Sequence, residues 1–208
     1  MEPKDRILQK AHELFYQYGV RSVSMNDIAV PLGMSKKTIY QYYADKEELV
    51  GAVFLTVMEQ NRTHCLRDEK EAENAIHEIF LAFDRVQEMF ATMNPSILYE
   101  LQKYHPRVFD QFKKFKNEFL YNIIRANLER GMKDGHYRAE LDADVLTRFR
   151  LHTIMLAFNA EVYFADPTKM VHIEKQLLEH YLYGLATASG VKLIQKYKNQ
   201  RDKKIQYA

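Results

Sequence analysis

The chain has 208 residues, of which 47% are hydrophobic and 28% charged, as is typical of a globular protein of one or two domains. The single Cys65 excludes an internal disulfide framework and a multi-cysteine zinc site, and no uncharged apolar run reaches the roughly 18 residues that could span a membrane. The N-terminus, MEPKDRILQK, lacks an apolar signal segment. These features predict a cytoplasmic protein that makes no use of a membrane.

The net charge of +2 is unevenly distributed along the chain. Residues 191–208 form a basic tail with a local charge of +5, so the remainder is at about −3. Whole-protein charge therefore gives no argument for nucleic-acid binding, and any such argument must be local. Within residues 33–46, the three lysines Lys36, Lys37 and Lys46 oppose a single carboxylate. This segment is the candidate basic surface.

Helical patterns follow one another along the chain, and no segment alternates as a strand would. Four helices are expected in the first third, at residues 3–18, 25–32, 36–43 and 46–66. Longer ones are expected at residues 75–93, 96–104, 108–135, 145–164 and 171–190. The predicted fold is therefore all-α, with about nine helices and no sheet, and the basic tail is expected to be frayed or loosely helical.

Residues 25–43 have the layout of a helix-turn-helix, in which a turn containing glycine joins two short helices. The close crossing of the helices needs a small residue, here Ala29, and the turn favours glycine, here Gly33, because φ is positive there. The apolar Ile39 can anchor the second helix against the first. This spacing predicts a DNA-binding motif whose second helix enters the major groove.

The outward face of that second helix carries short polar and basic side chains that can reach base edges and phosphates. The candidates for DNA contact on this face are Ser35, Lys36, Lys37, Thr38, Gln41 and Tyr42. Packing within the domain is the alternative role for the tyrosines in this stretch.

The surrounding sequence resembles the DNA-binding domain of the TetR family of transcriptional regulators over residues 7–55. The matching segments read ILQKAHELFYQYG, then VSMNDIA, then GMSKKTIYQYYADKEEL. The most specific part is the aromatic end of the recognition helix followed by a lysine, represented by Tyr40, Tyr43, Lys46 and Leu49. The later segment GHYRAELDADV is similar to the connector that often precedes the dimerisation helices of this family.

The resemblance implies a role for each matching residue. Tyr40 is expected to contact a phosphate or a thymine methyl group. Lys46 and Ser24, at the starts of the fourth and second helices, are expected to hold phosphates. Three others are expected in the core: Ile39, Tyr43 and Leu49.

Pro31 departs from the family pattern, which has a helix-forming residue at this position. Proline lacks the N–H group that would bond to the carbonyl of Asp27. We therefore expect the second helix to kink or end early, around Val30, with Leu32 still packing inward.

The larger helical part shows no catalytic constellation. None of the eight histidines follows a glutamate by three positions, and no His-Glu-x-x-His, phosphate-binding glycine loop or Gly-x-Ser-x-Gly motif occurs. We expect neither enzyme activity nor a metal or other cofactor. The aromatic stripes are either plain core or the lining of a pocket for a small apolar ligand. The candidate pocket residues are Phe83, Phe90, Phe112, Phe119, His152 and Met155.

A homodimer is expected, because one recognition helix reads too few base pairs and two half-sites roughly 34–36 Å apart need a two-fold partner. The segments 145–164 and 173–188 are the candidate interface, since the family resemblance implies a dimer of such helices. Gly184, Ala186 and Ala188 would permit close approach. Packing within the monomer alone is the alternative.

The sequence thus predicts a sequence-specific DNA-binding transcriptional regulator, a ligand-responsive repressor in which a pocket changes the recognition-helix spacing through the fourth helix. The expected organisation is a helix-turn-helix domain at 1–48, a regulatory and dimerisation domain at 49–190 and the basic tail at 191–208. Two other classes stay open. One is an all-α small-molecule-binding protein or enzyme with a merely structural helix-turn-helix, and the other is a membrane-surface protein that uses its tail.

Overall fold

A computed structural model describes residues 2–156 and 167–206, and these residues form helices and no β-strand. The all-α prediction is confirmed. Residues 157–164 of the predicted helix 145–164 lie outside the described residues. None of the described helices is both long enough and apolar enough to cross a membrane.

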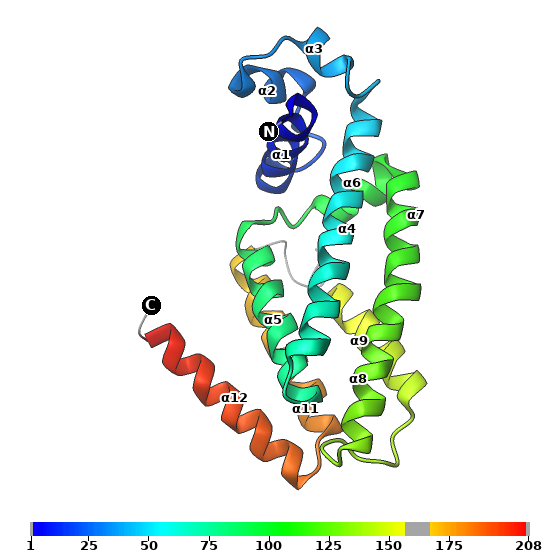
Figure 1. The fold of residues 1–208 in the computed structure, drawn as a ribbon, viewed down its shortest axis with the longest axis vertical. Coiled ribbons are helices and arrows are strands. Elements are labelled where there is room, and N and C mark those ends of the chain that lie inside the picture. Colours follow the sequence, from blue (N-terminus) through cyan, green and yellow to red (C-terminus); the bar gives the residue numbers. More distant parts are fainter. Residues whose placement is uncertain (1, 157–166, 207–208) are drawn as a thin grey trace.

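The first helices form a small unit at one end of an elongated molecule (Figure 1). This unit contains α1 (Pro3–Tyr18), α2 (Met25–Ala29) and α3 (Lys36–Tyr40), and α4 (Lys46–Glu71) extends from it along the length of the molecule. Its centre is made of fully buried apolar side chains: Ile7, Ala11, Phe15, Ile28, Ile39 and Leu49. The apolar positions recur at helical spacing, so burial of one face of each helix stabilises the unit.

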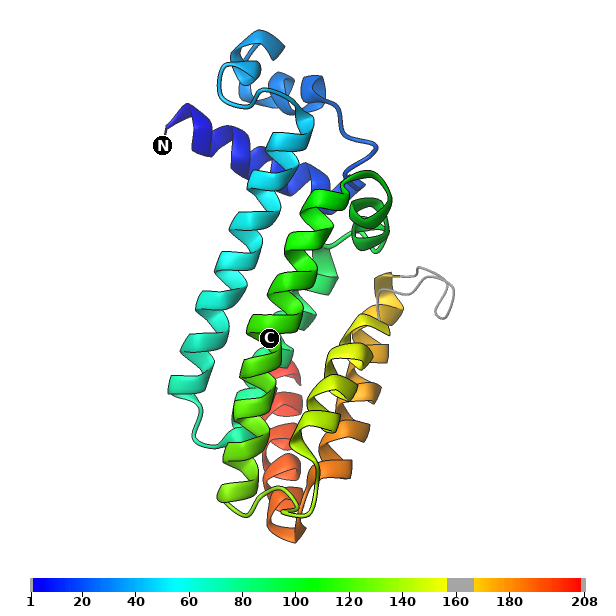
Figure 2. The ribbon, with the colours of Figure 1, turned by 90° about the vertical axis from the view of Figure 1, so that its right-hand side faces the viewer.

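The remaining helices form the larger part of the molecule, in which α5 packs against α4, and Figure 2 shows α4 and the α7–α8 rod running along the long axis. They are α5 (Ala75–Thr92), α6 (Ile97–Tyr104), α7 (Pro106–Lys114), η2 (Phe115–Leu120), α8 (Tyr121–Lys133), α9 (Ala143–Leu156), α11 (Pro167–Leu185) and α12 (Ala188–Gln206). The long helix predicted at 108–135 is present as the continuous rod α7–η2–α8. Its middle segment η2 is a π-helix, a wider turn that occurs often at functional sites.

Of the two expectations for the basic tail, a frayed segment or a loose helix, the described residues show a helix that continues to Gln206. α12 places Ile194 and Tyr197 in the same buried cluster as Ile76 and Phe80 of α5. Three of its cations form ion pairs with neighbouring helices and with the loop before α5: Lys196–Glu73 (3.1 Å), Lys198–Glu179 (2.8 Å) and Arg201–Asp84 (2.6 Å). The many charges of this segment belong to an amphipathic helix, and the apolar face of that helix packs on the rest of the protein.

Candidate nucleic-acid interface

The turn between α2 and α3 is built around Pro31 and Gly33. α2 ends at Ala29 and continues as a 3₁₀ turn, η1 (Val30–Leu32), so the expected early end of the second helix is confirmed. Gly33 then adopts the left-handed conformation with φ of 65°, and the Met34 amide donates to the carbonyl of Ala29 at 3.0 Å. Leu32 packs against the core as expected.

α3 is held against the other helices of the unit by its buried face, and its first turn is capped. Ala29 and Ile39 are both buried, as the helix crossing requires. The Ser35 hydroxyl accepts a hydrogen bond from the Thr38 amide at 3.1 Å and lies 2.9 Å from the Thr38 hydroxyl. These two hydroxyls therefore fix the first turn of α3, whereas Lys36 and Lys37 on the same turn are exposed.

The recognition helix is shorter than the predicted 36–43, because α3 ends at Tyr40. The following residues stay close to it, since the Tyr42 and Tyr43 amides both donate to the Ile39 carbonyl, at 2.9 and 3.1 Å. The three tyrosines have different environments. Tyr40 is 47% exposed, Tyr42 packs partly against the core, and Tyr43 is buried. Gln41 is exposed beside Tyr40.

The start of α2 is closed by a capping box. The Ser24 hydroxyl accepts from the Asp27 amide at 3.3 Å, and the Asp27 carboxylate accepts from the Ser24 amide at 2.7 Å. The Ser24 hydroxyl also donates to the Asp27 carboxylate at 2.7 Å, and the two bonds that this carboxylate accepts from Ser24 lower the pKa of Asp27. Ser24 remains exposed at this helix N-terminus, where the helix dipole favours an anion.

Lys46 has a structural partner inside the protein. Its ammonium donates to the Val20 carbonyl at 2.6 Å and lies 5.9 Å from the centroid of the Phe15 ring. Partial burial lowers its pKa. Lys46 thus ties the start of α4 to the loop after α1, a role that the sequence did not indicate.

A second candidate site is a cavity of about 270 Å³ between the helices of the larger part. Three of the predicted pocket residues line it: Phe83, Phe112 and Met155. The other three do not. Phe90 is packed in the core, Phe119 stacks on Phe115, and His152 is exposed with its Nδ1 beside the Arg148 carbonyl oxygen.

Sequence reasoning missed the polar residues of the cavity wall. Glu78, Arg150 and Glu174 all line it, and Glu174 pairs with Arg150 at 2.5 Å. Burial raises the pKa of both glutamates. A charged residue among the apolar positions of a helix could have indicated a polar site in the protein interior. Its partner could not be predicted, because the partner of each of these charges lies on another helix.

Comparisons with known proteins agree with this architecture. The family model described as "Bacterial regulatory proteins, tetR family" matches residues 7–53. The chain is 36% identical over 103 residues to the uncharacterized HTH-type transcriptional regulator YvaF of Bacillus subtilis (strain 168), an alignment that covers 48% of this chain and 53% of YvaF. The chain thus matches about half the length of that relative.

Two further matches extend along most of the chain. The HTH-type transcriptional regulator SAB2452 of Staphylococcus aureus (strain bovine RF122 / ET3-1) is 23% identical over 195 residues, covering 89% of this chain and 92% of the relative. The solved structure of the transcriptional regulator FadR from Bacillus subtilis, in complex with stearoyl-CoA, superposes with a TM-score of 0.66 at 21% identity, over 87% of this chain and 98% of FadR. Residues 7–53, which carry the helix-turn-helix, thus match the DNA-binding domain of the TetR family of transcriptional regulators, and most of the chain shares the fold of FadR.

Proposed function

We propose that this chain is a ligand-responsive repressor that binds operator DNA as a homodimer in the cytoplasm. The observation that carries the proposal is the exposed pair Lys36 and Lys37 on the first turn of α3, a helix fixed by its cap and by buried Ile39. Rigidly held cations on such a face suit phosphate and base contacts. The proposed division is DNA binding by residues 1–48 and regulation by 49–190, with 191–208 attached to the regulatory helices.

The proposed DNA contacts differ in what each side chain can offer. Lys36, Lys37, Tyr40 and Gln41 are exposed and can reach the groove directly. Three residues that also serve as local supports, Ser24, Ser35 and Thr38, would present helix N-termini to phosphates. Tyr42 has only its exposed edge for such a contact. Lys46 would meet a phosphate only by sharing or leaving its bond to Val20.

The proposed dimer uses α9 and α11. Val145 and Phe149 on α9 and Tyr183 on α11 are large side chains that stay exposed on the chain. A Cβ added at Gly184 would meet nothing within 4 Å, so a partner helix could approach closely there. Phe149→Glu should convert a dimer to a monomer in analytical ultracentrifugation, whereas Tyr99→Glu, at an exposed site on α6, should not.

The ligand response is proposed to pass through α6 as well as α4. Ile97 and Leu101 of α6 line the cavity. On the side toward the DNA-binding unit, Glu100 accepts from the Arg21 amide at 2.8 Å, and the Arg21 guanidinium donates to the Tyr104 hydroxyl at 3.1 Å. A ligand that shifts α6 would therefore move the unit that carries α3. The stearoyl-CoA bound to FadR supports a small-molecule ligand in this fold.

Selection of bound fragments from a genomic DNA pool tests the proposal. A defined operator should emerge, and Lys37→Ala and Lys46→Ala should each weaken binding to it in gel-shift titrations. If no fragment is enriched, or if neither substitution changes the affinity, the helix-turn-helix is only a structural element. The chain would then be a small-molecule-binding protein or an enzyme.

A further inference from the structure

The charges around the cavity are already balanced by protein partners. The four charged side chains that line it are Glu78, Arg85, Arg150 and Glu174. Each belongs to an ion pair: Glu78 with Arg130 (2.7 Å), Arg85 with Asp68, and Arg150 with Glu174 (2.5 Å). The cavity therefore has no net charge to offer a ligand.

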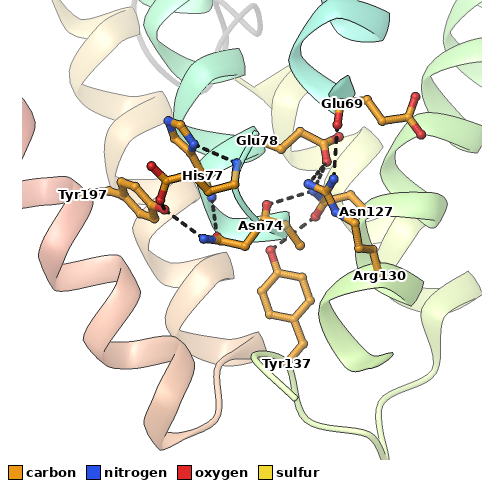
Figure 3. Close-up of polar contacts among 10 residues, drawn as sticks. Glu69, Asn74, His77, Glu78, Asn127, Arg130, Tyr137 and Tyr197 are labelled. Carbon is orange, nitrogen blue, oxygen red and sulfur yellow. Dashed lines mark hydrogen bonds and ion pairs between the residues drawn. The ribbon is translucent and has the colours of Figure 1, made fainter. Parts of the chain in front are cut away.

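One polar part of the cavity wall, around Glu78 and Asn127, is hydrogen-bonded within the protein. Glu78 Oε2 accepts from Asn127 at 2.9 Å and from Arg130 at 2.7 Å, and the Tyr137 hydroxyl donates to the Asn127 side-chain oxygen at 3.2 Å (Figure 3). Asn127 also donates to the Ala75 carbonyl at 2.9 Å. The side chains of Glu78 and Asn127 therefore need no ligand group to complete their hydrogen bonds.

A second polar part of the wall, around Arg150, Glu174 and Tyr181, has open hydrogen-bonding atoms. Among the residues that the structure describes, Nη1 of Arg150, Oε2 of Glu174 and the hydroxyl of Tyr181 are buried polar atoms without a hydrogen-bond partner. Glu174 is 1% and Tyr181 4% exposed. The three side chains adjoin, because Arg150 pairs with Glu174 and its guanidinium carbon lies 5.6 Å from the centroid of the Tyr181 ring. Buried polar atoms are rarely left unpaired, so a group bound beside these three side chains would complete their hydrogen bonds.

The open atoms define what that group must be. Arg150 Nη1 donates a hydrogen bond, the ionised Glu174 oxygen accepts one, and the Tyr181 hydroxyl can do either. We propose that the cavity binds an elongated neutral molecule with an apolar body and one hydroxyl or amide, whose polar group lies between Arg150, Glu174 and Tyr181. The regulatory meaning of this site rests on the ligand response proposed above.

An anionic ligand is disfavoured by the same arrangement. A carboxylate placed beside this pair would meet Arg150, but it would also lie beside the carboxylate of Glu174, and the pair has no spare positive charge. Burying an uncompensated charge is costly. The polar group expected here therefore differs from the acyl-CoA seen in FadR.

Isothermal titration calorimetry at pH 8 on the full chain tests this with ligands that share one alkyl chain. The ligands are 1-decanol, decanamide, 1-methoxydecane, decanoate and decanoyl-CoA. Decanol and decanamide should bind about tenfold or more tightly than decanoate and decanoyl-CoA. Methoxydecane cannot donate to Glu174, so it should bind about threefold to tenfold more weakly than decanol.

Two substitutions locate the polar group. Tyr181→Phe should weaken decanol about threefold to tenfold without lowering the melting temperature of the ligand-free protein, because the deleted hydroxyl has no protein partner there. Glu174→Gln leaves Arg150 uncompensated, so decanoate should gain about tenfold over its affinity for the wild-type protein. Tyr18→Phe, at an exposed site on α1, should change none of these values.

The inference is overturned if decanoate or decanoyl-CoA binds the wild-type protein as tightly as decanol, if Tyr181→Phe leaves decanol binding unchanged, or if no ligand of the series binds. Because these titrations contain no DNA, they separate the two proposals. Decanol binding that follows the predicted pattern but leaves operator affinity unchanged would uphold the site and refute the ligand response.

Discussion

The DNA-binding unit and the cavity region are both built from α-helices, but they place their polar side chains in opposite environments. Within the described part of residues 1–48, no charged or amide side chain is buried, and a core of aliphatic and aromatic side chains holds α3 while its polar side chains face outward. Around the cavity, by contrast, Glu78, Asn127 and Glu174 are buried among the helices. A surface that reads DNA needs exposed polar atoms on a rigid apolar base, whereas a selective ligand site needs polar atoms that have been taken out of water.

The largest effect is expected from Ile39→Ala, which attacks the apolar base of the DNA-binding unit. Ile39 is fully buried, so its truncation should lower the free energy of unfolding by about 2–5 kcal/mol and should also loosen α3. Urea denaturation and operator titration would both report the loss. Leu55→Ala, at a position on α4 that is 59% exposed, should leave both values near wild type. Equal behaviour of the two variants would show that the α3 anchor has been misassigned.

A slightly smaller effect is expected from Arg130→Met, which attacks a buried ion pair of the cavity region. The substitution leaves the Glu78 carboxylate buried without its counter-charge, at a cost of about 3 kcal/mol at pH 8. Burial already raises the pKa of Glu78, so the Glu78 carboxylate binds a proton more readily in the folded state than in the unfolded state. The variant should therefore regain stability as the pH falls through the Glu78 pKa.

Urea denaturation at pH 5 and pH 8 measures this dependence. Arg125→Met on the same helix removes an exposed arginine paired with Glu129 and should have little effect at either pH. A cost for Arg130→Met that does not change with pH would mean that Glu78 is not the group left uncompensated.

The smallest effect on stability is expected from Tyr197→Phe, which tests whether hydrogen bonds of the Tyr197 side chain help to hold α12 against the cavity region. The Tyr197 hydroxyl donates to Glu73 at 2.8 Å and accepts from Asn74 at 2.8 Å (Figure 3). Removing this link should cost about 1 kcal/mol in thermal or chemical unfolding. Tyr99→Phe, at an exposed site, should cost less. If the two variants do not differ, α12 is held by its apolar side chains alone.

The two regions also differ in how much of them could be predicted from sequence. In the DNA-binding unit the signals are local: the spacing of Ala29, Gly33 and Ile39 gave the helix-turn-helix, and Pro31 gave the early end of α2. Even there, the bond from Lys46 to Val20 joins residues that no short motif connects.

In the cavity region the helices could be predicted, but their polar partners could not. Glu78 and Arg130 are 52 residues apart, and Arg150 and Glu174 are 24 apart. Helical periodicity shows which face of a helix is apolar, not which helix will lie against it. Three of the six predicted pocket residues do not line the cavity for the same reason, as His152 illustrates by facing solvent.

The salt dependence of operator binding tests the central claim, that the exposed face of α3 binds DNA, most directly. Lys37→Ala should weaken binding and make the plot of log affinity against log salt shallower by about 0.9 for each DNA phosphate that the variant no longer neutralises. Lys192→Ala makes the same charge change at an exposed position on α12, at the opposite end of the molecule from α3 (Figure 1), and should leave the slope unchanged. Identical affinities and slopes for the two variants would contradict the account.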